Sequence, residues 1–520
     1  MKYDILVIGS GIAGMMAAIE AKELGSNVAI VMKKSPLANN SFMAKGGINA
    51  ALNNMGDGDS IEHHIEDTLK SGVGLAEEEA VRIFCEQAPQ VVRELHRRFK
   101  VPFTTLPDGR LAQRPFGGTK YKRTCYAADA TGPAIMKALN KALKELNIDT
   151  IKNHFALNLL INDGKIAGAT FLDESTGEVK TIQAKSIIIA TGGYAGLYKG
   201  YTTNVSDATG DGIAMGLRAG LEGMDMEFVQ FHPTGLKGSN YLISEAARAE
   251  GGKLINSDGK EFVDELNTRD FVARAILKQI QRGKEVYLDL TDIPEEIINT
   301  KLINLKKRVK SLKGIDITKE PIPINPLAHY SMGGIKTDTY GFTDIQGLFY
   351  AGEAGNNGVN GANRLGGNSL SEGAVFGKLT GYNAVKYSHR NKEFVEIKKE
   401  DIQKDIDLVE KLKNSKINAK EIKHQLGEIM YQKVGIIRNG YALKKALNKI
   451  NELKKLDIND EDSSLIEKIE ALNGLDIAKA VTKAALSREE SRGAHFRMDF
   501  PESDYGFLHH TYTKINQTSQ

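Results

Sequence analysis

Two histidines and two arginines stand in short motifs rich in glycine or proline, far apart along the chain. His232 lies in Gln-Phe-His-Pro-Thr-Gly, and His329 opens His-Tyr-Ser-Met-Gly-Gly. Arg269 lies in Thr-Arg-Asp, and Arg364 lies in Gly-Ala-Asn-Arg-Leu-Gly-Gly. Glycine lets a ligand come close to the backbone, and an arginine in such a loop suits bidentate binding of a carboxylate. Each motif alone would also suit an ordinary turn, but together the four side chains predict a pocket for a small dianion.

A nucleotide site is predicted at the N-terminus. Residues 3–8 form an apolar run typical of a buried strand, Gly-Ser-Gly-Ile-Ala-Gly follows at 9–14, and a helical pattern continues to residue 24. Strand, glycine turn and helix in this order place a pyrophosphate at the N-terminus of the helix. The second strand, residues 27–32, leads into Lys33 rather than into the acid that usually binds a ribose. This lysine could accept a phosphate or could simply be solvated.

The composition excludes several classes of partner. Lysine and arginine total 69 against 66 acidic residues, so the formal net charge is only +3 and nothing favours a nucleic acid. Cys85 and Cys125 show no metal-binding or iron–sulfur spacing, and we expect two reduced thiols in a cytoplasmic protein and no metal. We expect no signal peptide and no membrane-spanning run. The basic stretch 301–313 is interpreted as the solvated face of a helix.

The patterns along the chain predict an α/β protein of several parts. Residues 1–225 alternate strand and helix patterns. Residues 226–340 carry both histidines and one of the arginines, and we expect them to form an inserted domain. Residues 341–390 return to strand, glycine loops and helix. Residues 395–490 have helical spacing and almost no glycine or proline, which predicts a helical bundle, and residues 491–520 are left as a C-terminal tail.

Further motifs connect these parts to a known family. Gln-Arg-Pro-Phe-Gly-Gly begins at residue 113, Ser-Glu-Ala-Ala-Arg-Ala-Glu-Gly-Gly at 244, and Arg-Glu-Glu-Ser-Arg-Gly-Ala-His at 488. With the motifs above, and over nearly the whole chain, they resemble the flavoprotein subunits of fumarate reductase and succinate dehydrogenase, and their relative L-aspartate oxidase. The resemblance implies FAD in a Rossmann-like FAD-binding domain that is interrupted by an α+β capping domain. A helical domain is expected to follow.

The resemblance also implies roles for single residues. Arg269 would be the proton donor or acceptor, with Glu245 and Arg248 as its relay. The residues that it implies for the dicarboxylate are His232, Ser244, His329 and Arg364, with Phe116 beside them. The residues that it implies for FAD are Gly9, Ser10, Gly11, Ile12, Ala13, Gly14, Lys33, Ser41, Gly46, Gly47, Asp211, Glu353, Ser369 and Leu370. Ser244 stands where relatives usually have threonine, and its hydroxyl can do the same work.

Two positions depart from the family pattern. Asn40 stands where membrane-bound relatives attach FAD covalently to a histidine, so we expect non-covalent FAD. Asn360, just before the Gly-Ala-Asn-Arg run, stands where relatives usually have histidine. The chain also ends soon after Arg492, without the longer C-terminal segment of many relatives.

Two other functions stay open. An L-aspartate oxidase must hold an ammonium group and does so with a glutamate. Here the matching position is Phe116, and burying an unpaired ammonium would cost several kcal/mol. The fumarate and succinate branch is therefore favoured. A non-catalytic flavin-binding assembly subunit is the alternative of another class. The resemblance further implies a membrane anchor and an iron–sulfur subunit, with this chain peripheral on the cytoplasmic face of the inner membrane.

Overall fold

A seven-stranded sheet organises the part of the chain that begins at the N-terminus. The computed structural model describes residues 1–453 and 463–515. The strands run in the order β6-β2-β1-β9-β8-β7, and β16 also pairs with β9. The parallel strands are β1 Lys2–Ile8, β2 Val28–Val31, β6 Asp149–Ile151, β9 Val179–Ile189 and β16 Leu348–Tyr350. An antiparallel edge follows with β7 His154–Asn162 and β8 Lys165–Asp173. The expected α/β class is confirmed.

The turn after β1 needs glycine because two stretches of backbone meet there. Gly9 has a φ of +113°, and a Cβ on it would lie 2.3 Å from the carbonyl oxygen of Ala190, just after β9. A Cβ on Gly14, in the first turn of α1 (Ile12–Glu23), would lie 2.0 Å from the carbonyl oxygen of Gly9. Glycine at both positions therefore lets α1 begin directly at the end of β1, as the strand–glycine–helix pattern predicts.

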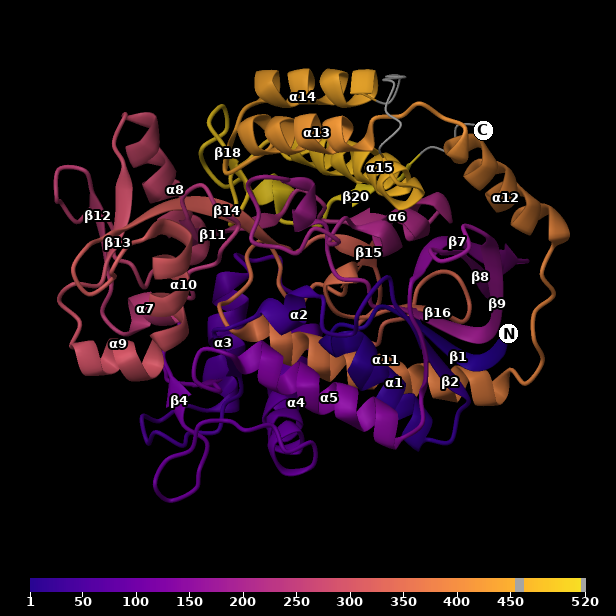
Figure 1. The fold of residues 1–520 in the computed structure, drawn as a ribbon, viewed down its shortest axis with the longest axis horizontal. Helices are drawn as coiled ribbons and strands as arrows, with labels where there is room; N and C mark the ends of the chain where they lie inside the picture. The colour runs from indigo at the N-terminus through magenta and orange to yellow at the C-terminus, as the bar shows by residue number, and fades with distance from the viewer. Residues whose placement is uncertain (454–462, 516–520) are drawn as a thin grey trace.

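Helix α1 packs closely against α11 (Asn368–Arg390) in the lower half of Figure 1. A Cβ on Gly377 would lie 2.4 Å from the carbonyl oxygen of Ala13, so small residues on α11 let the two backbones approach. Around this pair lie α2 Asn40–Met43, α3 Ile61–Ser71, α4 Glu78–Arg97 and α5 Thr131–Glu145. Small strands complete this part: β3 Ile48–Asn49, β4 Gln113–Arg114 and β5 Thr124–Cys125.

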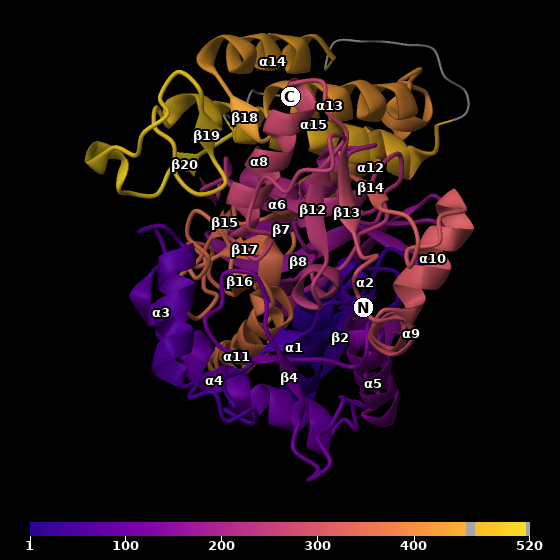
Figure 2. The same ribbon diagram turned by 90° about the vertical axis from the view of Figure 1, so that its left-hand side faces the viewer.

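A second, antiparallel sheet lies to one side of the molecule, at the left of Figure 1 and toward the viewer in Figure 2. Its strands run in the order β11-β14-β13-β12. They are β11 Val229–Leu236, β12 Lys253–Asn256, β13 Val286–Asp289 and β14 Ile322–Ser331. Its helices are α7 Ala246–Ala249, α8 Arg269–Gln281, α9 Glu295–Lys301 and α10 Ile303–Lys313. On α10, Leu305 and Val309 are buried while most lysines are exposed, which confirms the solvated face predicted for the basic stretch.

Long helices form the upper layer of Figure 1. They are α13 Ala419–Lys433, α14 Gly440–Leu453 and α15 Leu465–Ser487, while α12 Lys399–Lys413 packs against both α15 and β7. Helix α15 also packs against α6 (Asp211–Arg218). Residues 454–462 of the expected helical segment and 516–520 of the expected tail lie outside the described residues. No helix in the described part of the chain is long and apolar enough to cross a membrane.

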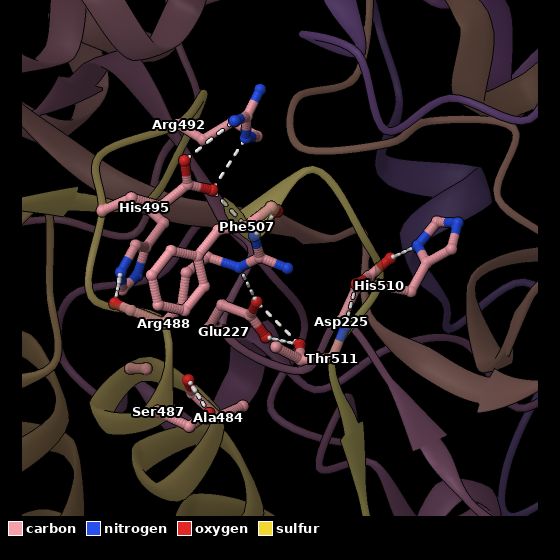
Figure 3. A network of polar contacts seen from close by, with 12 residues as sticks. Asp225, Glu227, Ala484, Ser487, Arg488, Arg492, His495, Phe507, His510 and Thr511 are labelled. Carbon is pink, nitrogen blue, oxygen red and sulfur yellow. Dashed lines mark hydrogen bonds and ion pairs between the residues drawn. The ribbon is translucent and has the colours of Figure 1, made fainter. Parts of the chain in front are cut away.

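A network of buried charges fixes the segment after α15 to the rest of the fold (Figure 3). The Arg488 guanidinium donates to Glu227 at 2.6 Å through Nε and to Glu490 at 2.8 Å through NH1. Arg492 in turn donates to both carboxylate oxygens of Glu490, at 2.7 and 2.8 Å. Because each buried charge has an opposite partner, this arrangement avoids the large cost of an unpaired buried ion.

The last described residues add a strand to a small sheet. β20 Tyr512–Thr513 pairs with β10 Gly223–Met224, which continues through β15 Gly334–Lys336 to β17 Gly355–Asn356. Next to β20, the His510 ring lies between Asp225, 2.6 Å from Nδ1, and Glu77, 3.0 Å from Nε2. Thus a histidine bridges the end of the chain to two acids far away in the sequence.

Candidate active site

Most of the residues expected to bind FAD line one cavity at the carboxyl ends of β1, β2 and β9. The lining includes Gly9, Ser10, Gly11, Ile12, Ala13, Lys33, Ser41, Asp211, Glu353, Ser369 and Leu370. The remaining three are placed differently. Gly14 packs on Gly9, and Cβ atoms on Gly46 and Gly47 would meet the Phe116 ring and the β5 residue Thr124, respectively. The cavity also reaches Tyr241 and His329, so it extends from the nucleotide motif to the second sheet.

The local chemistry of this cavity fits a dinucleotide. Helix α1 starts at it, and the helix N-cap Gly11 has no side-chain cap. Such an end attracts phosphate through its free N–H groups and the helix dipole. Gly192, with a φ of +77°, also lines the cavity, and a Cβ there would meet no atom within 4 Å. Bare backbone with open space beside it is what a bound cofactor would cover.

Lys33 is neither solvated nor available to hold a phosphate. Its ammonium lies 2.5 Å from an Asp211 oxygen and 2.9 Å from a Glu470 oxygen. Burial opposes the charge of Lys33, but the two carboxylates outweigh burial and raise the pKa of the ammonium. The two FAD residues implied by resemblance, Lys33 and Asp211, therefore neutralise one another and tie the cavity wall to α15.

Arg269 and Glu245 form the centre of the expected proton relay. The Arg269 Nε and NH2 groups both donate to Glu245 Oε2, at 2.9 and 2.7 Å. Glu245 Oε1 accepts from the backbone N–H of Gly117, and Arg248 NH2 lies 3.7 Å from Oε2. Burial opposes the charge of Glu245, yet Arg269 and Arg248 lower its pKa, so this carboxylate is ionised. The structure thus brings the three relay residues together.

Gln230, to which the sequence analysis gave no role, connects the two arginines. Its Oε1 accepts a hydrogen bond from Arg269 NH1 at 3.0 Å and another from Arg364 NH2 at 3.0 Å. Its Nε2 donates to the backbone oxygen of Arg364 at 2.7 Å and to Asn363 Oδ1 at 3.0 Å. Gln230 is fully buried on β11. It therefore holds an arginine of α8 and an arginine of the loop before α11 in one fixed geometry.

Arg364 is buried without an ion-pair partner among the described residues. Its guanidinium carbon lies 4.2 Å from the centre of the Tyr330 ring, and in the described part of the chain its Nε has no hydrogen-bond partner. Burial and the nearby Arg269 lower its pKa to about 10, so the group still carries its charge at neutral pH. A buried cation with an unused donor is costly unless an anion binds there.

The two histidines meet edge to face next to these arginines. The ring centres of His232 and His329 are 5.1 Å apart at an angle of 67°. The backbone N–H of Thr234 donates to His232 Nδ1 at 3.3 Å, so that nitrogen is an acceptor and Nε2 carries the hydrogen. His329 Nδ1 lies 2.7 Å from the Thr203 hydroxyl. Burial, followed by the charge of Arg269, lowers the pKa of both rings, which are therefore neutral hydrogen-bonding groups.

Phe116 lies between the glycine motifs of the cavity and the Arg364 loop. A Cβ on Gly46 would lie 2.4 Å from its ring, and a Cβ on Gly366 would lie 2.9 Å from it. Ser244 is placed through its neighbour Ile243, whose backbone N–H donates to the Thr234 carbonyl and whose carbonyl accepts from the Thr234 hydroxyl, two residues after His232. Both residues are buried beside the groups with which the sequence analysis placed them.

Asn40, the residue at the flavin-linking position, is part of the wall that supports His329. Its Nδ2 donates to Asn204 Oδ1 at 2.6 Å, and its Oδ1 accepts from the backbone N–H of Val205 at 3.0 Å. Asn204 Nδ2 then donates to the backbone oxygen of His329 at 2.7 Å. The supporting segment that contains Thr203 and Asn204 carries no motif that the sequence analysis used, so the sequence offered no signal for it.

Comparison with known proteins agrees with this geometry. Residues 4–370 match the family described as FAD binding domain, and residues 423–520 match the family described as Fumarate reductase flavoprotein C-term. The chain is 35% identical over 562 residues to the succinate dehydrogenase flavoprotein subunit of Rickettsia conorii, covering 100% of this chain and 94% of that one. This chain belongs to the fumarate reductase and succinate dehydrogenase flavoprotein family. The FAD implied by the family resemblance is thereby confirmed.

Other members of the fumarate reductase and succinate dehydrogenase flavoprotein family support the assignment. One subunit of the fumarate reductase (CoM/CoB) of Methanothermobacter marburgensis is 39% identical over 525 residues, which covers 96% of this chain and 95% of the relative. Among solved structures, the flavoprotein FrdA of E. coli quinol fumarate reductase has a TM-score of 0.93 at 34% identity. That match covers 99% of this chain and 95% of the other.

Proposed function

We propose that this protein interconverts fumarate and succinate, with FAD as its redox cofactor. The observation that carries the proposal is the pair of buried arginines, Arg269 and Arg364, joined through Gln230. Two cations next to two neutral histidines suit a small dicarboxylate, and Arg364 has a donor left for it. The names of the relatives given above agree with a substrate of this class.

The dicarboxylate is bound in this proposal by Arg364, His232, His329 and Ser244. Arginine supplies charge, and the neutral imidazoles and the hydroxyl supply directed donors. These donors are fixed before the substrate arrives, because Gln230 and Thr203 already hold them. Donors that point to the place where negative charge develops stabilise the transition state more than the ground state.

Proton transfer is assigned to Arg269. When bound, FAD supplies the hydride chemistry of the reaction. The protein's own step is the delivery of a proton from the Arg269 guanidinium to the alkene carbon of fumarate that does not receive the hydride. The ionised Glu245 then takes up a proton that comes from solvent and passes it to the deprotonated Arg269 along the hydrogen bonds of 2.7 and 2.9 Å, with Arg248 balancing its charge. Burial of the three residues keeps bulk water away from the site.

The surrounding architecture is also part of the proposal. Residues 226–340 would act as a capping domain over the FAD-binding parts, 1–225 and 341–390, and its closure would bring Arg269 to the substrate. The relatives are named as subunits, which supports a membrane anchor and a separate iron–sulfur subunit. In that assembly the chain would lie on the cytoplasmic face of the inner membrane. Co-purification from native membranes should recover a cysteine-rich partner.

Purified, FAD-loaded protein tests the activity directly. Fumarate should oxidise a reduced viologen in a saturable manner, and L-aspartate should not reduce the flavin without oxygen. Saturable fumarate turnover would exclude a merely structural assembly role. Rapid bleaching of the flavin by aspartate, with none by succinate, would favour an aspartate oxidase instead.

A further inference from the structure

Two carboxylates next to the proposed dicarboxylate site are held by neutral donors: Glu372 is buried, and Glu353 lies in the wall of the cofactor cavity. Glu353 Oε1 accepts from the backbone N–H of Ser331 at 2.9 Å and from its hydroxyl at 3.1 Å. Glu372 Oε2 accepts from the Tyr330 hydroxyl at 3.0 Å and from Asn360 Nδ2 at 2.9 Å. The proton relay described above uses neither acid. Since Ser331 and Tyr330 are consecutive on β14, the two acids are attached to one short stretch of strand.

Arg364, the cation near this pair, makes its contacts with other groups. Arg364 stacks on the Tyr330 ring at 4.2 Å and donates through NH2 to Gln230. Two carboxylates that share one such cation cannot both be ionised without a large desolvation cost. Burial raises the pKa of Glu353 to about 7, with the charge of Glu372 adding to the effect. Burial also raises the pKa of Glu372, against its bonds from Asn360 and Tyr330.

Asn360 is the reason why, in this chain, Glu353 or Glu372 must carry a proton. The family pattern usually has a histidine at this position, and a protonated imidazole beside Glu372 would pair with an ionised carboxylate. The asparagine amide donates a hydrogen bond at 2.9 Å but carries no charge. The charge balance of the cluster must therefore be met by a proton on Glu353 or Glu372.

We propose that Glu353 and Glu372 form an internal proton store that takes up a proton from solvent when a dicarboxylate binds at Arg364. This proposal rests on the dicarboxylate site proposed above. The positive charge of Arg364 favours ionisation of the two acids. The negative charges of the bound dicarboxylate offset it, so the protonated form of the pair becomes more stable. One carboxylate oxygen becomes a hydroxyl, and no bond of the ligand changes. The store thereby keeps the pocket near neutrality as the dianion enters.

Few other charged groups face the pair among the described residues. On the loop before α11 the charged group is Arg364, and the neutral donors are Asn360 on the same loop and Tyr330 and Ser331 on β14. Tyr194 adds a buried phenol near Glu353, and its own pKa is raised well above the usual range, chiefly by burial. From α8, Arg269 acts on Arg364 as a like charge. Within this set, burial raises the pKa of Glu353 to about 7 and also raises the pKa of Glu372, so these carboxylates are the groups to which we assign the exchanged proton.

The test measures protons rather than turnover. Malonate is a dicarboxylate without an alkene, so it probes binding alone. Its binding to the FAD-loaded protein is followed by titration calorimetry at pH 6, 7 and 8 in buffers of different ionisation enthalpy. We expect uptake of up to about one proton per malonate at pH 7 and 8, and less at pH 6, where the pair is already protonated. In parallel, malonate should strengthen the infrared band of a protonated carboxylic acid.

Three variants make the result specific. Glu372→Gln should abolish the infrared change and reduce the proton uptake at pH 7 by more than half. Asn360→His should also suppress uptake at pH 7, because the imidazole holds a proton before malonate arrives. Asp405→Asn is the matched control: Asp405 is another buried acid with a raised pKa, and it is held by Asn158 of β7 and Thr170 of β8. Its replacement should leave the uptake unchanged.

The outcomes separate this inference from the proposed function. Malonate that binds without proton uptake in wild type overturns the proton store and leaves the dicarboxylate site intact. Uptake that persists unchanged in both Glu372→Gln and Asn360→His likewise overturns it. Absence of malonate and fumarate binding would instead overturn the proposed function. FAD content and thermal unfolding, recorded for each variant, identify a variant that has failed to fold. If Glu372→Gln or Asn360→His fails in this way, the remaining one of the two tests the proton store.

Discussion

Arg269 and Arg364 share a single hydrogen-bond acceptor, Gln230 Oε1, at 3.0 Å from each. Two like charges that are buried this close repel one another, so the shared oxygen does more than link them. It sets the distance between a residue of α8 and a residue of the loop before α11, and hence the geometry between the proposed proton donor and the proposed carboxylate clamp.

Gln230→Leu should therefore lower turnover strongly. Leucine keeps the volume but offers no acceptor, so Arg364 loses its side-chain acceptor and Arg269 keeps only its bonds to Glu245. A misplacement of about 1 Å can cost about 10²-fold in rate, and we expect a loss of this order in kcat with FAD content unchanged. The control is Gln425→Leu on α13, where the amide bonds to Glu421 in the same helix. Fumarate turnover of Gln230→Leu within a factor of two of the control would contradict this role.

FAD should leave the protein when it is denatured. Asn40 offers an amide where covalent attachment would need a histidine, and that amide is already bonded to Asn204 and Val205. Acid precipitation should release all of the yellow colour into the supernatant. Flavin fluorescence on the protein band of a denaturing gel would show that the prediction is wrong.

L-Aspartate should be a poor substrate because Phe116 has no charge to pair with an ammonium. Its ring is packed between Gly46 and Gly366, and the neighbouring Glu245 carboxylate is already paired with Arg269. Flavin reduction by aspartate without oxygen should be slower than reduction by succinate by orders of magnitude. The same anaerobic mixing experiment with both substrates would contradict the prediction if aspartate proved the faster reductant.

The bridge at His510 should stabilise the fold at acid pH and not at alkaline pH. Burial alone would lower the pKa of this ring, but its bonds to Asp225 and Glu77 raise it above the ordinary value of 6.5. A raised folded-state pKa means that the stabilisation is complete below about pH 6.5 and is lost as the pH rises through the higher pKa. Wild type should thus exceed His510→Gln in Tm at pH 6 by about 1 °C for each kcal/mol that the bridge contributes. The difference should shrink by pH 9, and a difference that grows with pH would refute the bridge.

The sequence predicted the parts of the site that depend on backbone shape. Gly9 and Gly14 could be assigned because their roles are local: each allows a contact that any Cβ would block. Arg364 and His232 could be singled out because the motifs around them are short and unusual. The expected solvated face of α10 followed from its spacing of apolar residues and lysines.

What the sequence could not predict depends on partners far away along the chain. Lys33 looked free, yet its partner Glu470 is contributed by α15, more than four hundred positions later. Gln230 stood in a quoted motif, but its role appears only when Arg269 and Arg364 are brought to it. Likewise, Glu490 lies in the same motif as Arg488, but the other partner of this arginine, Glu227, comes from a segment more than two hundred positions earlier.

Replacement of Arg269 tests the central claim most directly. FAD-loaded wild type and Arg269→Ala are compared for the oxidation of reduced viologen by fumarate, together with FAD content and malonate affinity. Positioned proton transfer contributes about 10²–10⁴-fold, so Arg269→Ala should lose at least that much turnover while it still holds FAD. Near wild-type fumarate turnover in Arg269→Ala would contradict the account.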